Sequence, residues 1–353
     1  MTKVIFVHAS FGEGHKTAAQ ALHQDFDAAC LDLLDFCHPR LRKLYSRGYK
    51  YITGHAALFW FVLFFLTRLR AVTGVIDIAN RVVFRRFLRH IEAERPDVVA
   101  TTHFFVAGLV SFLKKRYGTK IVVIITDLRA HPYWAHRGVD RYFAAMDVTA
   151  QDLVALGVPR ENILSGYVSL RPGFLGKLDR PALSASLFTQ DRPCVLFMSS
   201  LRGVFPYFEA VLTDLLAEYN LIVIYGSNRR LKAKLDKISN EALRYFERSD
   251  QIWELIAASD MIVTKPGGLT VFEGVYLRKP FIVTHYIPGQ EKGNMDILIS
   301  QGICRYAAGP VELIGAIRFF AANRERIAAN YPLKFKDIRP ALREVIRGLS
   351  DSR

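Results

Sequence analysis

Three segments place residues that bind anions or move protons where an apolar run turns into a helix. The first is Phe11-Gly12-Glu13-Gly14-His15, directly behind the apolar run 3–8. Glycines at such a turn let the backbone approach a ligand, and the N–H groups that open the helix favour an anion. We predict that Gly14 and His15 line a ligand site. The plainer alternative is a capping turn with an incidental histidine.

The second segment, 125–136, carries Asp127 directly behind the apolar run 120–126 and contains two histidines. The carboxyl ends of parallel strands meet at one edge of a sheet, so Asp127 is expected to face the same crevice as His15. A carboxylate in such a place can orient or deprotonate a hydroxyl. The alternative is an ordinary turn that begins with an aspartate.

The third segment leads from an apolar run through a Gly-Gly turn into a helix. Such a turn suits a diphosphate, and Glu273, one to two turns inside the helix, can accept hydrogen bonds from both hydroxyls of a ribose. Behind the next apolar run, short polar side chains suit the hydroxyls of a sugar, although a polar helix cap has the same composition. The donor-site residues predicted here are Lys265, Gly267, Gly268, Thr270, Glu273, Gln290, Glu291 and Asn294, and Gly14 of the first segment is assigned to the same donor site.

Eight short apolar runs alternate with helical stretches, at 3–8, 97–101, 120–126, 141–145, 194–198, 221–226, 261–265 and 280–285. Nearly continuous β-branched runs are typical of parallel strands covered on both faces. The alternation predicts an α/β fold with two Rossmann-like domains, which a length of 353 residues accommodates. A segment rich in Gly, Pro and Ser separates domains at 1–170 and 190–353. A last helix, about 336–349, is a candidate to pack back on the N-terminal domain.

The chain is both basic and apolar, with 48 Lys and Arg against 33 Asp and Glu and 51% hydrophobic residues. This excludes a disordered basic tail. Residues 38–95 hold nine of the fifteen excess charges and the apolar run 56–66. As a helix that run spans ~16 Å, about half of a ~30 Å hydrocarbon core.

Aromatic side chains beside arginines are typical of a helix at the surface of an anionic membrane. The three arginines after residue 80 recur at every fourth position and predict one helical stripe; a buried helix with a solvated basic face is the alternative. The predicted membrane-contacting residues are Phe59, Trp60, Phe61, Phe64, Phe65, Arg68, Arg81, Arg85 and Arg89.

The four cysteines are scattered and lack the spacing of a zinc site, so no metal is expected. Charge and glycine follow the first apolar run too soon for a signal peptide. We expect a cytoplasmic protein bound peripherally to the inner face of the cell membrane.

The motifs together resemble one glycosyltransferase family. FGEGH (11–15), TDLRAHPYWAH (126–136), VDRYFAA (139–145), LGVPRENILSGYVSLRPGF (156–174), TKPGGLTVFE (264–273) and IPGQEKGN (287–294) occur in family order. In these the chain is similar to the monogalactosyldiacylglycerol synthases and the bacterial processive diacylglycerol glucosyltransferases. It is more distantly similar to the peptidoglycan N-acetylglucosaminyltransferase.

The resemblance implies a GT-B fold with the active site in the cleft between the domains. By that analogy the C-terminal domain holds a UDP-sugar, with Glu273 on the ribose, the Gly267–Thr270 turn at the diphosphate, and Gln290 and Glu291 on the sugar. His15 matches a histidine proposed as base or acceptor-site residue, with Asp127 as the second candidate. No cofactor is implied, since the UDP-sugar is a substrate.

Two segments depart from the family pattern. Where relatives are often glycine-rich, this chain has Met198-Ser199-Ser200-Leu201-Arg202-Gly203, so Ser200 and Arg202 are added as donor-site candidates with Arg202 supplying charge to the phosphates. The interdomain segment has Val168-Ser169-Leu170-Arg171-Pro172 where relatives tend to have Ile-Pro-Val-Arg-Pro. This bears on hinge geometry rather than on the fold.

The sequence thus predicts an inverting transfer of a hexose from a UDP-sugar to diacylglycerol, or to a glycosyl-diacylglycerol in a second round. The donor is left open among glucose, galactose and glucuronate. Three alternatives remain: another lipid acceptor such as an undecaprenyl-linked intermediate, a nucleotide-sugar epimerase on the same scaffold, and a basic nucleic-acid- or membrane-binding protein without activity. No nucleic-acid-binding signature appears in the sequence, so nucleic acid is not an expected partner.

Overall fold

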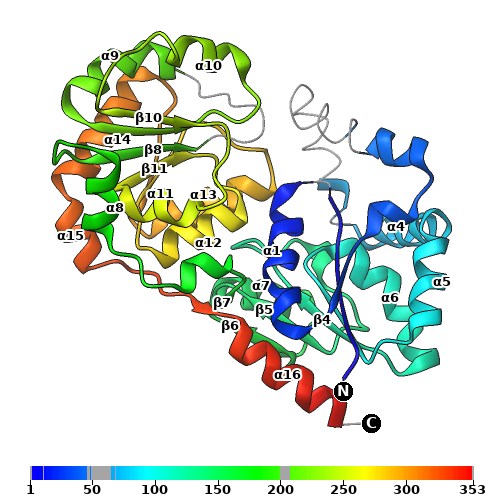
Figure 1. Cartoon of the computed structure of the whole chain (residues 1–353). Coiled ribbons are helices and arrows are strands. Elements are labelled where there is room, and N and C mark those ends of the chain that lie inside the picture. Colours follow the sequence, from blue (N-terminus) through cyan, green and yellow to red (C-terminus); the bar gives the residue numbers. More distant parts are fainter. Residues whose placement is uncertain are drawn as a thin grey trace. The chain divides into compact units, whose positions relative to one another are not determined.

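The computed structural model describes residues 2–10, 12–45, 48, 65–67, 69–198 and 207–351 (Figure 1). It divides into two units. The N-terminal unit comprises Met1–Arg171, Ile287–Gly293 and Phe335–Arg353, and the C-terminal unit comprises Pro172–Tyr286 and Asn294–Lys334.

A six-stranded sheet forms the centre of the N-terminal unit, with the strand order β2-β1-β3-β4-β5-β6. Neighbouring strands are all parallel. The central strands are buried on both faces, which explains their continuous apolar sequences. The strands are β1 (Val4–His8), β2 (Ala29–Asp32), β3 (Val98–Thr101), β4 (Lys120–Ile124), β5 (Arg141–Ala144) and β6 (Ile163–Ser165).

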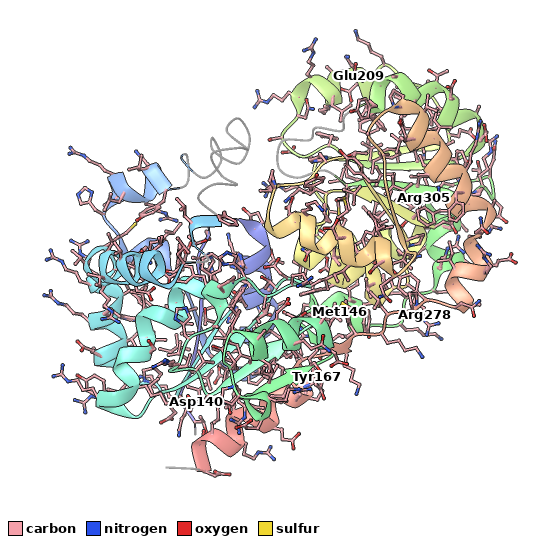
Figure 2. All side chains as sticks on the ribbon, turned by 180° about the vertical axis from the view of Figure 1, so that it is seen from behind. Asp140, Met146, Tyr167, Glu209, Arg278 and Arg305 are labelled. Carbon is pink, nitrogen blue, oxygen red and sulfur yellow. The ribbon has the colours of Figure 1, made fainter. Side chains whose placement is uncertain are left out.

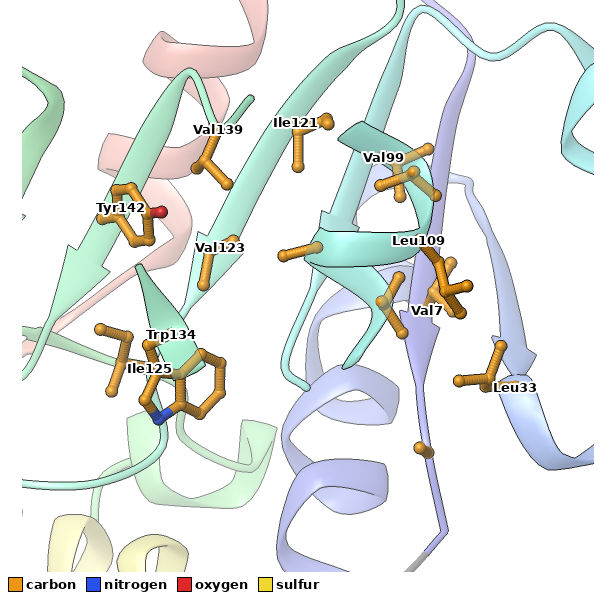
Figure 3. Close-up of a cluster of buried hydrophobic side chains, with 14 of the residues drawn as sticks. Val7, Leu33, Val99, Leu109, Ile121, Val123, Ile125, Trp134, Val139 and Tyr142 are labelled. Carbon is orange, nitrogen blue, oxygen red and sulfur yellow. The ribbon is translucent and has the colours of Figure 1, made fainter. Parts of the chain in front are cut away.

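The connections of this sheet are mostly helical, as parallel strands require. The helices are α1 (Glu13–His23), α4 (Arg70–Val83), α5 (Arg85–Glu94), α6 (Phe104–Tyr117) and α7 (Asp147–Ala155), with the 3-10 turns η1 (Gln24–Phe26), η2 (Leu33–Phe36), η3 (Pro132–Trp134) and η4 (Arg160–Asn162). One face of the sheet packs with α5 and α6 into a core that contains Val7, Val99, Val123, Ile125 and Trp134 (Figure 3).

The other face of the sheet is covered by the end of the chain, α16 (Arg339–Asp351), drawn in red in Figure 1. Ile338, Leu342 and Ile346 join Phe6 and Phe143 in one buried cluster. Just before α16, β14 (Lys336–Asp337) pairs in parallel with β7 (Tyr167–Val168). The Tyr167 ring (Figure 2) meets Phe143 edge-on at 5.9 Å, which fastens this small sheet to β5.

Arg339 anchors the start of α16. Its guanidinium forms ion pairs with Asp25 and Asp337 and donates to the carbonyl oxygens of Ala21 (2.7 Å) and Leu170 (2.9 Å). Only 7% of the side chain is exposed. One buried cation therefore ties α16 to the end of α1 and to the segment where the chain leaves the unit.

The C-terminal unit repeats the same plan with the order β10-β9-β8-β11-β12-β13, again all parallel. Its strands are β8 (Cys194–Met198), β9 (Asn220–Ile224), β10 (Leu243–Phe246), β11 (Met261–Thr264), β12 (Phe281–Val283) and β13 (Cys304–Tyr306). Its remaining elements are η5 (Pro172–Leu175), α8 (Arg180–Leu187), α9 (Phe208–Glu218), α10 (Arg229–Leu235), α11 (Ile252–Ala258), α12 (Gly268–Tyr276), α14 (Pro310–Ala322) and α15 (Arg324–Ala329). Helix α13 (Gln290–Ser300) begins in the N-terminal unit and continues in the C-terminal unit from Asn294.

The predicted α/β fold with two Rossmann-like domains is confirmed, and each of the eight apolar runs contains a strand. The predicted single stripe of Arg81, Arg85 and Arg89 is wrong, because α4 ends at Val83 and α5 begins at Arg85. Phe84 interrupts the helix and is 1% exposed. At this break between α4 and α5 the Phe84 ring enters the core together with Phe87. The face of the segment that carries these two rings is buried.

Candidate active site

The carboxyl ends of β1 and β3 bring the first predicted segment to a place suited to a ligand. β1 lies between β2 and β3, so the strand order reverses there. In open α/β sheets ligands bind at this topological switch point. α1 begins directly behind β1 and α6 directly behind β3, so both loops meet at the same edge.

His15 is held at this edge by two hydrogen bonds that it exchanges with Thr102. Its Nδ1 lies 2.6 Å from the Thr102 carbonyl oxygen, and the Thr102 hydroxyl donates to the His15 carbonyl oxygen at 2.8 Å. A carbonyl oxygen only accepts, so Nδ1 carries the proton and Nε2 is the unprotonated nitrogen of the neutral ring. The Thr126 hydroxyl is 3.1 Å from the same Nδ1.

Burial lowers the pKa of His15 to about 4, although the hydrogen bond to the Thr102 carbonyl oxygen by itself raises this pKa. The ring is therefore neutral at physiological pH, with Nε2 able to accept a proton. The space beside Gly14 is open, because a Cβ there would meet no described atom within 4 Å.

Asp127 is the next residue after Thr126, whose hydroxyl lies near the His15 ring. Asp127 is 3% exposed and lies three residues after the end of β4. Arg129 braces the rest of this loop, since its guanidinium pairs with both carboxylate oxygens of Asp152 (2.7 and 2.8 Å). The structure thus brings the segments 11–15 and 126–136 together around His15. The roles of His15 and Asp127 as bases stay predictions.

The segment Thr101-Thr102-His103 was not predicted from the sequence, although it lies at the end of an apolar run as the other candidates do. Thr102 fixes the tautomer of His15, and the His103 ring lies 4.7 Å from the His15 ring. Asp32 was also missed. It ends β2, and its Oδ1 accepts the N–H groups of Ser10 (3.2 Å) and Leu34 (3.0 Å), which holds the start of the glycine loop.

In the C-terminal unit the equivalent switch point lies between β8 and β11. α12 opens there with Gly267 as its N-cap, and this glycine has no side chain to cap the first N–H groups. Such a helix end attracts an anion. Four predicted donor residues belong to this turn, namely Lys265, Gly267, Gly268 and Thr270. Ser200 and Arg202, which follow β8, lie outside the described residues.

The remaining donor candidates lie deeper. Glu273 and Asn294 are both 0% exposed, and the Asn294 amide donates to the Pro266 carbonyl oxygen at 3.0 Å. Glu291 is 6% exposed and accepts the Ile287 N–H at 2.7 Å, which closes the loop before α13. Asn294 and Glu291 therefore shape their loops directly; the side chain of Gln290 lies outside the described residues.

Part of the predicted membrane-contacting segment is described. Phe65 is 53% exposed, and Arg81, Arg85 and Arg89 are all exposed. Among the described residues no helix is long and apolar enough to cross a bilayer. The other predicted contacts lie outside the described residues: Phe59, Trp60, Phe61, Phe64 and Arg68.

The outer face of α4 carries an apolar stripe that sequence analysis missed. Val75, Ile78 and Val82 are 67%, 63% and 69% exposed, and their spacing places them on one helical face. The inner face of α4 is polar at Asp77, which accepts the Tyr133 hydroxyl at 2.8 Å. The three side chains form what we call the α4 stripe.

In the described part of the chain, no three His, Cys, Asp or Glu side chains come together in a group that could hold a metal ion. The expectation that the protein needs neither a metal nor another cofactor stays a prediction.

Known families match both halves of the chain. Residues 15–165 match the monogalactosyldiacylglycerol (MGDG) synthase family, and residues 200–296 match the glycosyltransferase family 28 C-terminal domain. The processive diacylglycerol beta-glucosyltransferase of Bacillus mycoides (strain KBAB4) is 29% identical over 311 residues, which cover 83% of this chain and 78% of the relative.

Solved structures share the fold at low sequence identity. The glycotransferase of kitacinnamycin aligns with a TM-score of 0.61 at 13% identity, over 99% of this chain and 97% of that one. MurG of Acinetobacter baumannii aligns with a TM-score of 0.60 at 13% identity, over 99% and 100%. The chain therefore carries a monogalactosyldiacylglycerol synthase domain followed by a glycosyltransferase family 28 C-terminal domain, on the fold of these solved glycosyltransferases, and is similar to the processive diacylglycerol glucosyltransferases.

Proposed function

We propose that the protein transfers a hexose from a UDP-sugar to the primary hydroxyl of diacylglycerol, with inversion at the anomeric carbon and, in a second round, to the glycosyl-diacylglycerol product. The observation that carries the proposal is the neutral His15 with its unprotonated Nε2 at the switch point of the N-terminal sheet. The name of the relative from Bacillus mycoides supports diacylglycerol as the acceptor.

The reaction is a single displacement. The acceptor oxygen attacks the anomeric carbon of an α-linked donor and gives up its proton to His15 Nε2, while the bond from the anomeric carbon to the phosphate oxygen breaks and UDP leaves. The product is a β-glycoside. General-base catalysis of this kind contributes roughly 10²–10⁴-fold to the rate.

The charge that develops on UDP is stabilised by the N–H groups at the start of α12 and by positive side chains such as Lys265. These groups are fixed before the reaction begins, which makes their electrostatic stabilisation effective. Glu273 holds the ribose and the polar residues before and within α13 hold the sugar. Ser200 and Arg202 complete the donor set.

We propose that the N-terminal unit docks peripherally on the cytoplasmic face of the membrane. The α4 stripe gives an exposed apolar surface, and Arg81, Arg85 and Arg89 lie exposed nearby in the sequence. An apolar face beside cations suits an anionic bilayer.

The direct test is turnover of UDP-glucose, UDP-galactose and UDP-glucuronate on diacylglycerol vesicles, with analysis of the lipid products. Transfer of one or more hexoses to diacylglycerol, in β-linkage, is expected. Conversion of the free nucleotide sugar without lipid would favour an epimerase. Transfer only to a polyprenyl-linked lipid would replace diacylglycerol as the proposed acceptor. Retention on DNA without turnover would overturn the proposal.

Glu273→Gln is expected to raise the KM for the UDP-sugar about 10-fold, because an amide accepts the two ribose hydroxyls less strongly than a carboxylate. The KM for diacylglycerol is expected to stay unchanged. Steady-state kinetics with each substrate varied in turn makes the distinction. A KM for the donor that does not change would remove Glu273 from the donor site.

Replacing Val75, Ile78 and Val82 together with serine is expected to weaken binding to both neutral and anionic vesicles about 150-fold, because about 1 kcal/mol of apolar burial is lost at each side chain. The matched control changes Arg81, Arg85 and Arg89 to glutamine and is expected to weaken binding to anionic vesicles alone. Flotation of both variants, with UDP binding measured in parallel, checks this. Equal loss of vesicle and UDP binding would contradict a membrane role.

A further inference from the structure

His103 lies directly beside the proposed base but plays no part in the reaction described above. It is 2% exposed, and its ring centroid lies 4.7 Å from that of His15 with the rings inclined by 67°. Two further rings pack against it, Phe104 at 4.3 Å and Phe105 at 5.0 Å. His103 therefore stands between His15 and the aromatic side chains at the start of α6.

Two hydrogen bonds to neighbouring residues fix the position of His103. As the N-cap of α6 its Nδ1 accepts the Phe105 N–H at 3.3 Å, and its own N–H donates to the Thr101 hydroxyl at 3.0 Å. Because Nδ1 accepts, the proton of the neutral ring is on Nε2. Protonating Nδ1 would break the helix cap, so this histidine is held neutral by the fold.

The surroundings of His15 show what else faces its ring. Thr102 and Thr126 bond to its Nδ1, and Trp134 lies 6.3 Å away. The ionisable groups nearby are His8, with Asp32 at 3.9 Å from it, Asp127 next to Thr126, Glu13 and Lys16 on α1, and His103. His103 makes the nearest ring contact with His15 among the described residues.

We propose that His103 is a positioning residue that holds the ring of His15 in one orientation and shields it from water. The inference rests on the proposed function, in which His15 Nε2 accepts the proton of the acceptor hydroxyl. Thr102 fixes where the proton of His15 resides, and His103 fixes how the ring stands. Neither residue has to touch the substrate.

Two substitutions separate the ring of His103 from its helix cap. His103→Asn keeps a side-chain oxygen that can cap α6 but removes the ring, since asparagine is a preferred N-cap residue. His103→Phe keeps a ring but removes the cap. A residue with a purely structural role would affect thermal stability most in the variant without a cap, and catalysis would follow stability.

For His103→Asn we expect kcat about 10-fold below wild type, an unchanged KM for the UDP-sugar and a nearly unchanged melting temperature. We also expect the acid limb of the pH profile to move up from about 4 toward the ordinary histidine value of 6.5, because water reaches the His15 ring. For His103→Phe we expect a lower melting temperature with the acid limb still near 4. A normal kcat and an unmoved acid limb in His103→Asn would overturn the proposal.

The titration of the His15 ring protons by NMR tests the contact without any turnover. A midpoint at least one pH unit higher in His103→Asn than in wild type supports the positioning role, and equal midpoints overturn it. If instead wild-type protein fails to glycosylate diacylglycerol, or His15→Ala keeps full activity, the proposed function fails while the NMR result still decides whether His103 controls the environment of His15.

Discussion

His15→Ala is expected to lower kcat for transfer to diacylglycerol about 10³-fold, within the range for loss of a general base. The substitution removes the nitrogen that accepts the proton of the attacking hydroxyl. It leaves the C-terminal unit untouched, so UDP binding is expected to stay as in wild type. Single-turnover kinetics with saturating donor separates the chemical step from binding.

The matched control is His23→Ala at the other end of α1. His23 also bonds to a backbone carbonyl through Nδ1, that of Ala28 at 3.0 Å, but lies about two turns from the site. Its removal is expected to leave kcat near normal. Near-normal rates in both His15→Ala and Asp127→Ala would show that neither residue is the base.

The pKa of His15 also sets the pH dependence. The ring accepts a proton only when it is neutral, and burial lowers its pKa to about 4. kcat/KM for the lipid acceptor is therefore expected to remain level from pH 7 down to about 5 and to fall as the pH drops through about 4. An acid limb at 6.5 would mean that His15 is hydrated in solution or that another group titrates.

Arg339→Met is expected to lower the free energy of unfolding by about 3–5 kcal/mol, because it leaves charged partners without their buried cation. The half-buried Asp337 carboxylate and the carbonyl oxygens of Ala21 and Leu170 all lose a donor. The apolar face of α16 then loses its anchor on the N-terminal sheet. Urea unfolding followed by circular dichroism measures the change.

Arg343→Met is the matched control, one turn further along α16. The Arg343 guanidinium donates to the Asp25 carbonyl oxygen at 2.9 Å, but 54% of the side chain is exposed. Exposed charge pairs contribute little, so a loss below ~1 kcal/mol is expected. Equal losses in the two variants would show that burial of Arg339 adds no stability.

The strands that the sequence predicted are the inner strands of both sheets. β1, β3, β4 and β5 lie inside the N-terminal sheet, and β8, β9, β11 and β12 inside the C-terminal one. Inner parallel strands are covered on both faces, which requires a continuous apolar run. The edge strands were missed. β2 (ACLD) and β13 (CRY), for example, are short and partly exposed, and therefore lack that signal.

The residues of the candidate site also fall into those that the sequence predicted and those that it did not. Glycine turns and polar residues behind apolar runs marked His15, Asp127 and the α12 turn, because ligand-binding groups of an α/β fold gather where strands end. The segment Thr101-Thr102-His103 also lies at the end of a strand, but threonines beside a histidine are common polar residues and have no distinctive spacing. Their importance appears only in the distance from Thr102 to His15.

The sequence by itself determined the fold class, because the alternation of buried strands and helices is a local property of the chain. It also located the basic and apolar character in residues 38–95. Only the tertiary structure decided which apolar residues there face inward. Phe87 and Ile91 are 0% and 2% exposed, while Val75 and Ile78 remain outside. A period of 3.6 gives a helix an apolar face, but only the packing partners of that face decide whether it is buried.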